Sequence, residues 1–168
     1  MAREARRETA ARTPRRPPWR WPSSWRGWPS VGKRRKSREL ALQFLYELDL
    51  HDDGGGASRL GEFWTRHPAD AVVRTFTEEL VRGTREHQQK IDDLIRQFTE
   101  HWSLDRMAVV DRNILRQGIY ELLWAPDVPP KVTINEALEV AKKFSTQESS
   151  RFINGILDRI RKEFRPAS

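Results

Sequence analysis

The apolar residues of this chain recur at the spacing of an α-helix from residue 35 almost to its C-terminal end. Ala41, Phe44, Leu45 and Leu48, for example, follow the i, i+3, i+4, i+7 pattern that places side chains on one helix face. No stretch alternates apolar and polar residues in the manner of a half-buried strand. The pattern therefore predicts an all-α protein of about seven helices, packed as one or two small bundles.

Capping patterns and helix breakers indicate where several of these helices begin and end. Ser103 is a candidate N-cap for a helix that Pro126 should stop. Residues 133–136 and 145–148 each fit the capping box, in which a hydroxyl and a carboxylate satisfy the first backbone N–H groups. Gly83 is a candidate break in a long apolar stripe. The 168 residues thus divide into helices of ordinary length within one domain.

The positive charge of the chain is concentrated at its N-terminal end. Residues 1–38 contain 13 lysines and arginines against two glutamates, a net charge of +11. Residues 39–168 contain 18 basic and 22 acidic residues, a net charge of −4, so the whole chain carries +7. A polyanion should therefore meet the N-terminal arm and the start of the first helix.

Five cations crowd the expected start of that first helix, at residues 33–36 and 38. The positive end of a helix dipole and its unpaired N–H groups favour carboxylates, and each cation there is unfavourable by roughly 0.3 kcal/mol or more. A phosphate backbone satisfies both the N–H groups and the cations. The cluster therefore indicates a binding site for a nucleic acid.

Residues 1–33 form a basic extension rich in proline and tryptophan, which we expect to be disordered. Five of the ten prolines lie before residue 30, where they interrupt any helix or strand. Arginines alternate with tryptophans at Trp19, Trp21, Trp25 and Trp28. The tract either grips single-stranded RNA or an anionic surface, or it is a variable extension without a fixed role.

The sequence gives little support for catalysis or for a metal site. It has no cysteine, and its four histidines lie too far apart for the short spacings of a zinc site. It contains neither a GxxxxGK[ST] loop nor a GxGxxG turn. The adjacent acids Asp92 and Asp93 point about 100° apart on a helix, and we expect them to be solvated rather than paired. These features predict a binding protein with no enzyme activity, no metal and no cofactor.

Location can also be predicted from composition. No apolar run approaches the roughly 20 residues of a membrane span, and the N-terminus lacks the apolar core of a signal peptide. The absence of cysteine fits a reducing compartment. We therefore expect a soluble protein of the cytoplasm with no membrane partner.

Three segments resemble one known family closely. These are RRKSRELALQFLYELDL, DRNILRQGIYELLWAPDVPPKVTINEALEVAKKF and SSRFINGILDRI, which together span about residues 34–164. They resemble the bacterial transcription antitermination factors of the NusB family. The resemblance implies an all-helical domain of two three-helix bundles over residues 34–168. It also implies a factor that binds the boxA element of nascent ribosomal-operon RNA with ribosomal protein NusE, loads onto RNA polymerase and suppresses termination.

The resemblance assigns an RNA surface to the arginine-rich helix start and to the turn between the last two helices. Carried over by motif position, the RNA-contact residues are Arg34, Arg35, Lys36, Arg38, Gln43, Phe144, Glu148, Arg151 and Phe152. Phe144 and Phe152 would stack on unpaired bases, and Glu148 and Gln43 would contact base edges. Two alternatives stay open, because Glu148 also completes a capping box and Phe152 also lies on an apolar stripe.

A second surface is indicated by Leu42 and Tyr46, which lie one turn apart and away from the core stripe. The resemblance implies that Tyr46 and Asp111, the acid that opens the VDRNILR segment, hold NusE. Local packing of Tyr46 is the alternative.

Three other functions fit parts of the sequence. A related helical domain begins the ribosomal RNA cytosine methyltransferases, although 168 residues leave no room for a cofactor-binding domain. An RNA chaperone of ribosomal RNA maturation would need no protein partner. Some relatives also self-associate through the RNA face, so a homodimer stays open.

Overall fold

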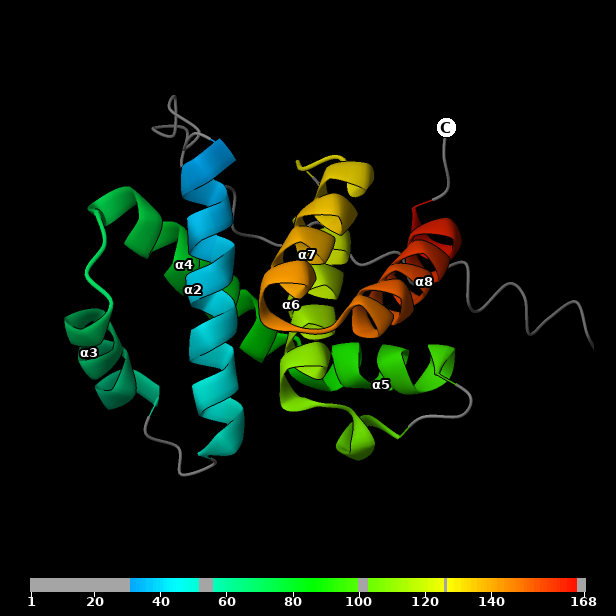
Figure 1. Ribbon diagram of the computed structural model, residues 1–168, viewed down its shortest axis with the longest axis horizontal. Helices are drawn as coiled ribbons and strands as arrows, with labels where there is room; N and C mark the ends of the chain where they lie inside the picture. The colour runs from blue at the N-terminus through cyan, green and yellow to red at the C-terminus, as the bar shows by residue number, and fades with distance from the viewer. Residues whose placement is uncertain (1–30, 52–55, 100–102, 126, 166–168) are drawn as a thin grey trace, which may run out of the picture.

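The computed structural model describes residues 31–51, 56–99, 103–125 and 127–165, which are helical apart from short connections (Figure 1). Its seven α-helices are α2 (Val31–Leu50), α3 (Gly56–Arg66), α4 (Ala71–Glu86), α5 (Gln88–Phe98), α6 (Val109–Trp124), α7 (Pro130–Phe144) and α8 (Gln147–Phe164). A 3-10 helix, η1 (Leu104–Arg106), precedes α6. The described residues contain no strand, and the prediction of an all-α fold with about seven helices is confirmed.

Helix α6 lies at the centre of the fold. It packs against five other helices, which are α2, α4, α5, α7 and α8. Twelve of its 16 residues are buried, which is typical of a helix surrounded by other helices. Helices α2, α3 and α4 form one group and α6, α7 and α8 form the second, as Figure 1 shows. None of the described helices is long and apolar enough to cross a membrane.

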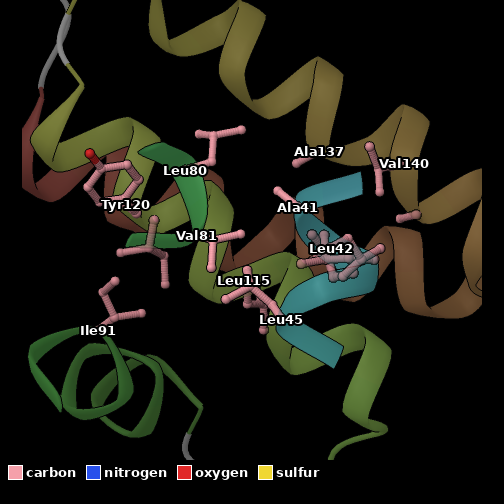
Figure 2. Packing of buried hydrophobic residues seen from close by; sticks show 14 of the residues in the cluster. Ala41, Leu42, Leu45, Leu80, Val81, Ile91, Leu115, Tyr120, Ala137 and Val140 are labelled. Atoms are coloured by element: carbon pink, nitrogen blue, oxygen red, sulfur yellow. The ribbon is translucent and has the colours of Figure 1, made fainter. Parts of the chain in front are cut away.

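One continuous apolar core joins the two groups of helices. Figure 2 shows Leu42 and Leu45 of α2 in the same cluster as Leu115 of α6 and Val140 of α7. Leu42 is only 2% exposed, so its predicted place on a second surface is wrong. The physical reason is that α4, α6 and α7 all pack against α2, which buries a wider face than one apolar stripe.

Two of the predicted helix starts differ from the structure. Helix α7 begins at Pro130, whose fixed φ suits the first turn, so Thr133 lies inside the helix and is fully buried. The N-cap of α8 is Thr146 rather than Ser145, and its hydroxyl accepts from the Ser149 N–H at 3.1 Å. Both predicted capping boxes are therefore out of position.

Two other predicted boundaries also differ from the structure. Ser103 precedes the short η1 helix without a side-chain cap, and α6 begins only at Val109. Residues 31–33, at the end of the expected extension, belong to α2. The rest of that extension, residues 1–30, lies outside the described residues.

Gly83 does not break α4, which continues to Glu86. A Cβ added at position 83 would lie 2.1 Å from Cζ of Tyr120, far inside van der Waals contact. Tyr120 is 2% exposed, so its ring is held in place by the surrounding core. Glycine at this position lets α4 and α6 approach closely.

This close approach predicts that two glycine-to-alanine substitutions differ strongly in their effect on the free energy of unfolding. Gly83→Ala should lower the free energy of unfolding by about 1–3 kcal/mol through overpacking. Gly61→Ala is the matched control, because no atom lies within 4 Å of its added Cβ and alanine favours the helix by up to about 1 kcal/mol. Urea unfolding of both variants measures the difference. Equal stabilities would show that the Tyr120 ring moves aside.

Candidate nucleic-acid interface

The basic cluster lies further inside α2 than its sequence position suggested. Because α2 begins at Val31, only Lys33 and Arg34 lie in its first turn, where the helix dipole acts most strongly. The ammonium of Lys33 also lies 3.0 Å from a carboxylate oxygen of Asp70, next to the start of α4. Part of the expected repulsion is therefore relieved within the protein.

Arg35 joins α2 to α7 while staying partly exposed. Its Nε and Nη2 donate to the two carboxylate oxygens of Glu136, each at 3.0 Å. The hydrogen bonds from the guanidinium to Glu136 raise the pKa of Arg35. The Arg35 side chain is 40% exposed against 7% for Glu136, so its outer edge still faces solvent.

Arg38 is a buried residue, in contrast to the surface position that its predicted RNA contact requires. It is 2% exposed, and its guanidinium donates to Glu121 at 2.8 and 3.0 Å. Burial alone would lower the pKa of Arg38, but the Glu121 carboxylate outweighs it and the pKa is raised. Glu136 lies 3.9 Å away and is shared with Arg35. Arg38 therefore holds α2, α6 and α7 together and has no surface for a phosphate.

The exposed cations of α2, α7 and α8 form a continuous surface. Lys143, in the last turn of α7, pairs with Glu39 of α2 at 2.9 Å. Lys36 and Gln43 lie on the same side of α2 as Glu39, at i, i+3 and i+7 spacing, with Lys36 exposed and Gln43 half-buried. Figure 1 shows α7 between α2 and α8.

The surface continues from α7 to α8. A groove of about 450 Å³ between these helices is lined by Lys142 and Arg151, among others. We define the basic face as Arg35, Lys36, Lys142, Lys143 and Arg151. Lys142 and Lys143 belong to this face but were not among the predicted RNA contacts. The signal for them was two cations in the last turn of a predicted helix, where the dipole favours them.

The remaining predicted RNA residues surround the turn between α7 and α8, except for Arg34, which is half-buried on α2. Phe144 is half-buried, with the Lys143 ammonium 5.5 Å from its ring centroid. Phe152 is half-buried and packs partly on the core, so its position is compatible with both base stacking and core packing. Glu148 is exposed at the second residue of α8 and is not the partner of a Ser145 cap.

Asp111 fixes this turn to the start of α6. One carboxylate oxygen accepts from the hydroxyl of Ser145 at 2.5 Å, and the other accepts from the hydroxyl of Ser149 at 2.7 Å. Asp111 is 9% exposed. The residue is therefore a structural anchor of the turn as well as a predicted partner contact.

Tyr46, the other predicted partner residue, lies on an exposed patch of α2. Tyr46 is 37% exposed, and Leu50, one turn later, is 51% exposed. Arg112 donates to Asp49 at 2.7 Å and so holds this end of α2 against the start of α6, next to Asp111. The two predicted partner residues therefore lie in one region of the molecule.

A network of buried and partly buried charges underlies this region. Burial would raise the pKa of Asp49, but hydrogen bonds from Arg112 and Asn113 outweigh it and lower the pKa. Arg116 donates to Asp49 at 3.0 Å and to Asp92 at 2.8 Å. The expectation that Asp92 is solvated is therefore wrong, because α6 places a buried arginine opposite it.

Asp93 differs from its neighbour, because it is exposed and pairs with Arg96 on its own helix. Among the residues that the structure describes, no group of three or more histidine, aspartate or glutamate side chains is arranged to hold a metal ion.

An all-helical body with a cationic face built from three helices is typical of a helical nucleic-acid-binding protein. The family model of the NusB family matches residues 35–162, and this chain belongs to that family. The transcription antitermination protein NusB of Geobacter sulfurreducens is 52% identical over 132 residues, which cover 77% of this chain and 94% of that protein. Its counterpart in Thermodesulfovibrio yellowstonii is 44% identical over 140 residues, covering 78% and 93%.

Two solved structures show the same fold. T. maritima NusB has a TM-score of 0.72 at 41% identity and covers 79% of this chain and 93% of its own. A crystal structure of antitermination factors NusB and NusE in complex with dsRNA has a TM-score of 0.69 at 26% identity, covering 79% and 98%. The predicted resemblance is confirmed. The family is one of antitermination proteins rather than enzymes, which confirms the prediction of a binding protein.

The burial of Arg38 predicts that neighbouring cations of α2 differ sharply in their effect on stability. Arg38→Ala leaves the Glu121 carboxylate buried without its partner and should lower the free energy of unfolding by about 3 kcal/mol. Lys36→Ala should change it by less than about 0.5 kcal/mol, because Lys36 is exposed. Thermal and urea unfolding of the two variants provide the comparison. A small effect of Arg38→Ala would show that Glu121 finds another partner.

Proposed function

We propose that this protein binds the boxA element of nascent ribosomal-operon RNA together with ribosomal protein NusE. The complex joins the RNA polymerase elongation complex in the cytoplasm and suppresses termination. Membership of the family supports the antitermination role. The observation that supports RNA binding is the basic face, which gathers cations from three helices. The Lys143–Glu39 pair joins α7 to α2, and Lys142 and Arg151 line the groove between α7 and α8.

The basic face supplies the contacts to phosphate, and the turn between α7 and α8 supplies the contacts to bases. Lys36, Lys143 and Arg151 are exposed and bind the RNA backbone. Phe144 and Phe152 are each half-buried, and in this proposal they stack on unpaired bases. Glu148 and Gln43 contact base edges at either side of the turn.

Arg34, Arg35 and Arg38 have different parts in this proposal. Arg38 acts through Glu136, which it shares with Arg35, and so positions the Arg35 guanidinium rather than binding RNA itself. Arg35 faces RNA with the exposed edge of its side chain. Arg34 is half-buried and contributes its positive charge to the field at the start of α2.

NusE binds at the second surface, formed by Tyr46, Leu50 and Asp111. Tyr46 and Leu50 together give an exposed apolar patch on one side of α2. Asp111 adds negative charge next to this patch. An aromatic anchor beside a carboxylate fits a basic partner, which ribosomal proteins commonly are.

The RNA proposal predicts a change in salt dependence. The double variant Lys36→Ala/Arg151→Ala removes one cation from each side of the basic face and should bind boxA RNA more weakly. Its plot of log affinity against log salt should be shallower by about 1.4, since each lost phosphate contact on a single strand contributes about 0.7. Fluorescence anisotropy at several salt concentrations measures the slope.

The matched control is Lys90→Ala/Lys162→Ala, which also removes two exposed cations, from α5 and from the last turn of α8. Its slope should stay at the natural value. If both double variants lost the same slope, RNA binding would depend on net charge and the basic face would be excluded as the site.

The partner proposal predicts that a substitution on the NusE surface weakens NusE binding and leaves RNA binding unchanged. Tyr46→Ala should weaken NusE binding by about 30-fold, the effect of truncating an aromatic anchor at an interface. The affinity for RNA alone should not change. Val72→Ala is the control, because Val72 is a similarly exposed apolar residue, 40% exposed, on α4. Isothermal titration with NusE measures the effect, and an unchanged NusE affinity of Tyr46→Ala would remove α2 from the interface.

A further inference from the structure

The hydroxyls of Ser145 and Ser149 both donate to one carboxylate, that of Asp111 (2.5 and 2.7 Å). Ser145 ends α7, and Ser149 lies in the first turn of α8, so the two serines hold both sides of the turn. Asp111 belongs to the first turn of α6, a different helix. We call these three residues the serine clip.

The serine clip is not needed to cap either helix. The hydroxyl of Thr146 caps α8 by accepting from the Ser149 N–H. The backbone N–H of Ser145 bonds the carbonyl of Ala141 and so closes α7. Helix ends alone therefore do not account for two serine hydroxyls on the same carboxylate, and their effect is to fix the turn to α6.

The clip joins the two surfaces of the proposed function. On one side, the turn carries Phe144 and Glu148 of the RNA surface. On the other side, Asp111 lies beside the end of α2 that carries Tyr46, because Arg112 pairs with Asp49. A carboxylate has about four lone-pair sites, and the two serines use one on each oxygen. A cation of the partner that reaches Asp111, which is 9% exposed, can therefore use a remaining lone pair without displacing the serines.

We propose that Ser145 and Ser149 are positioning residues that couple NusE binding to RNA binding through Asp111. This inference rests on the proposed function. The clip is already closed in the chain alone, and a partner cation at Asp111 restrains it further, so RNA binds a turn with less freedom left to lose. Linkage requires the reverse effect as well, so bound RNA raises the affinity for NusE by the same factor.

The test is a set of three titrations of the full chain: with a boxA RNA oligonucleotide, with purified NusE, and with the RNA in the presence of saturating NusE. The coupling factor is the ratio of the two RNA affinities. For the natural sequence we expect a factor of about fivefold or more. For Ser145→Ala/Ser149→Ala we expect a factor close to one, with each separate affinity changed less than about threefold.

Two further variants separate the clip from general damage to the turn. The Ser150 hydroxyl belongs to the same turn, but it donates to the Thr146 carbonyl at 3.2 Å and not to Asp111. Ser150→Ala should therefore keep the full coupling factor. Ser149→Thr keeps a hydroxyl and should keep more coupling than Ser149→Ala. Circular dichroism of each variant checks that the helix content is retained.

The outcomes are distinct. Full coupling in Ser145→Ala/Ser149→Ala overturns the inference and indicates that NusE contacts the RNA directly. Equal loss of coupling in Ser150→Ala also overturns it, because any disturbance of the turn would then suffice. A natural chain that binds both ligands without coupling overturns the inference alone. A natural chain that binds neither ligand overturns the proposed function, and the inference falls with it.

Discussion

Two charge pairs along α2, one buried and one partly buried, hold this helix antiparallel to α6, and the rest of the structure depends on that arrangement. Arg38 pairs with Glu121 near the end of α6, and Asp49 pairs with Arg112 near its start. Such pairs add little net stability relative to apolar packing, but removing one partner is costly. We interpret them as fixing the register of α2, which sets where the basic face and Tyr46 lie relative to α7 and α8.

The cations at the start of α2 serve two purposes that the sequence alone did not separate. Lys33 and Arg35 pair with Asp70 and Glu136, so carboxylates from other helices offset part of their charge. Arg38 is buried in the core, where it pairs with Glu121. The cluster is therefore partly structural, and in our proposal RNA binding depends as much on Lys143 and Arg151, which other helices bring to the same face.

The helical period predicted the all-α fold well, because burial of one face leaves a direct trace in the spacing of apolar residues. Pairings between distant residues leave no such trace. Arg38 and Glu121 are 83 positions apart, and Asp92 meets Arg116 only after α5 folds onto α6. The resemblance to a family brought together the right helices but did not show that Arg38 is buried. Capping patterns missed the start of α8 by one residue, since Ser145 and Thr146 both offer a hydroxyl.

The central claim is that RNA and protein partner occupy two different surfaces of one helical body. Chemical-shift changes of backbone amides, followed in ¹⁵N-labelled full chain, test it most directly. Titration with boxA RNA should shift amides in the first half of α2, the last turn of α7 and the first two turns of α8. NusE should shift amides around Tyr46 and the start of α6. RNA-induced changes centred on α3 and α4 would contradict the account.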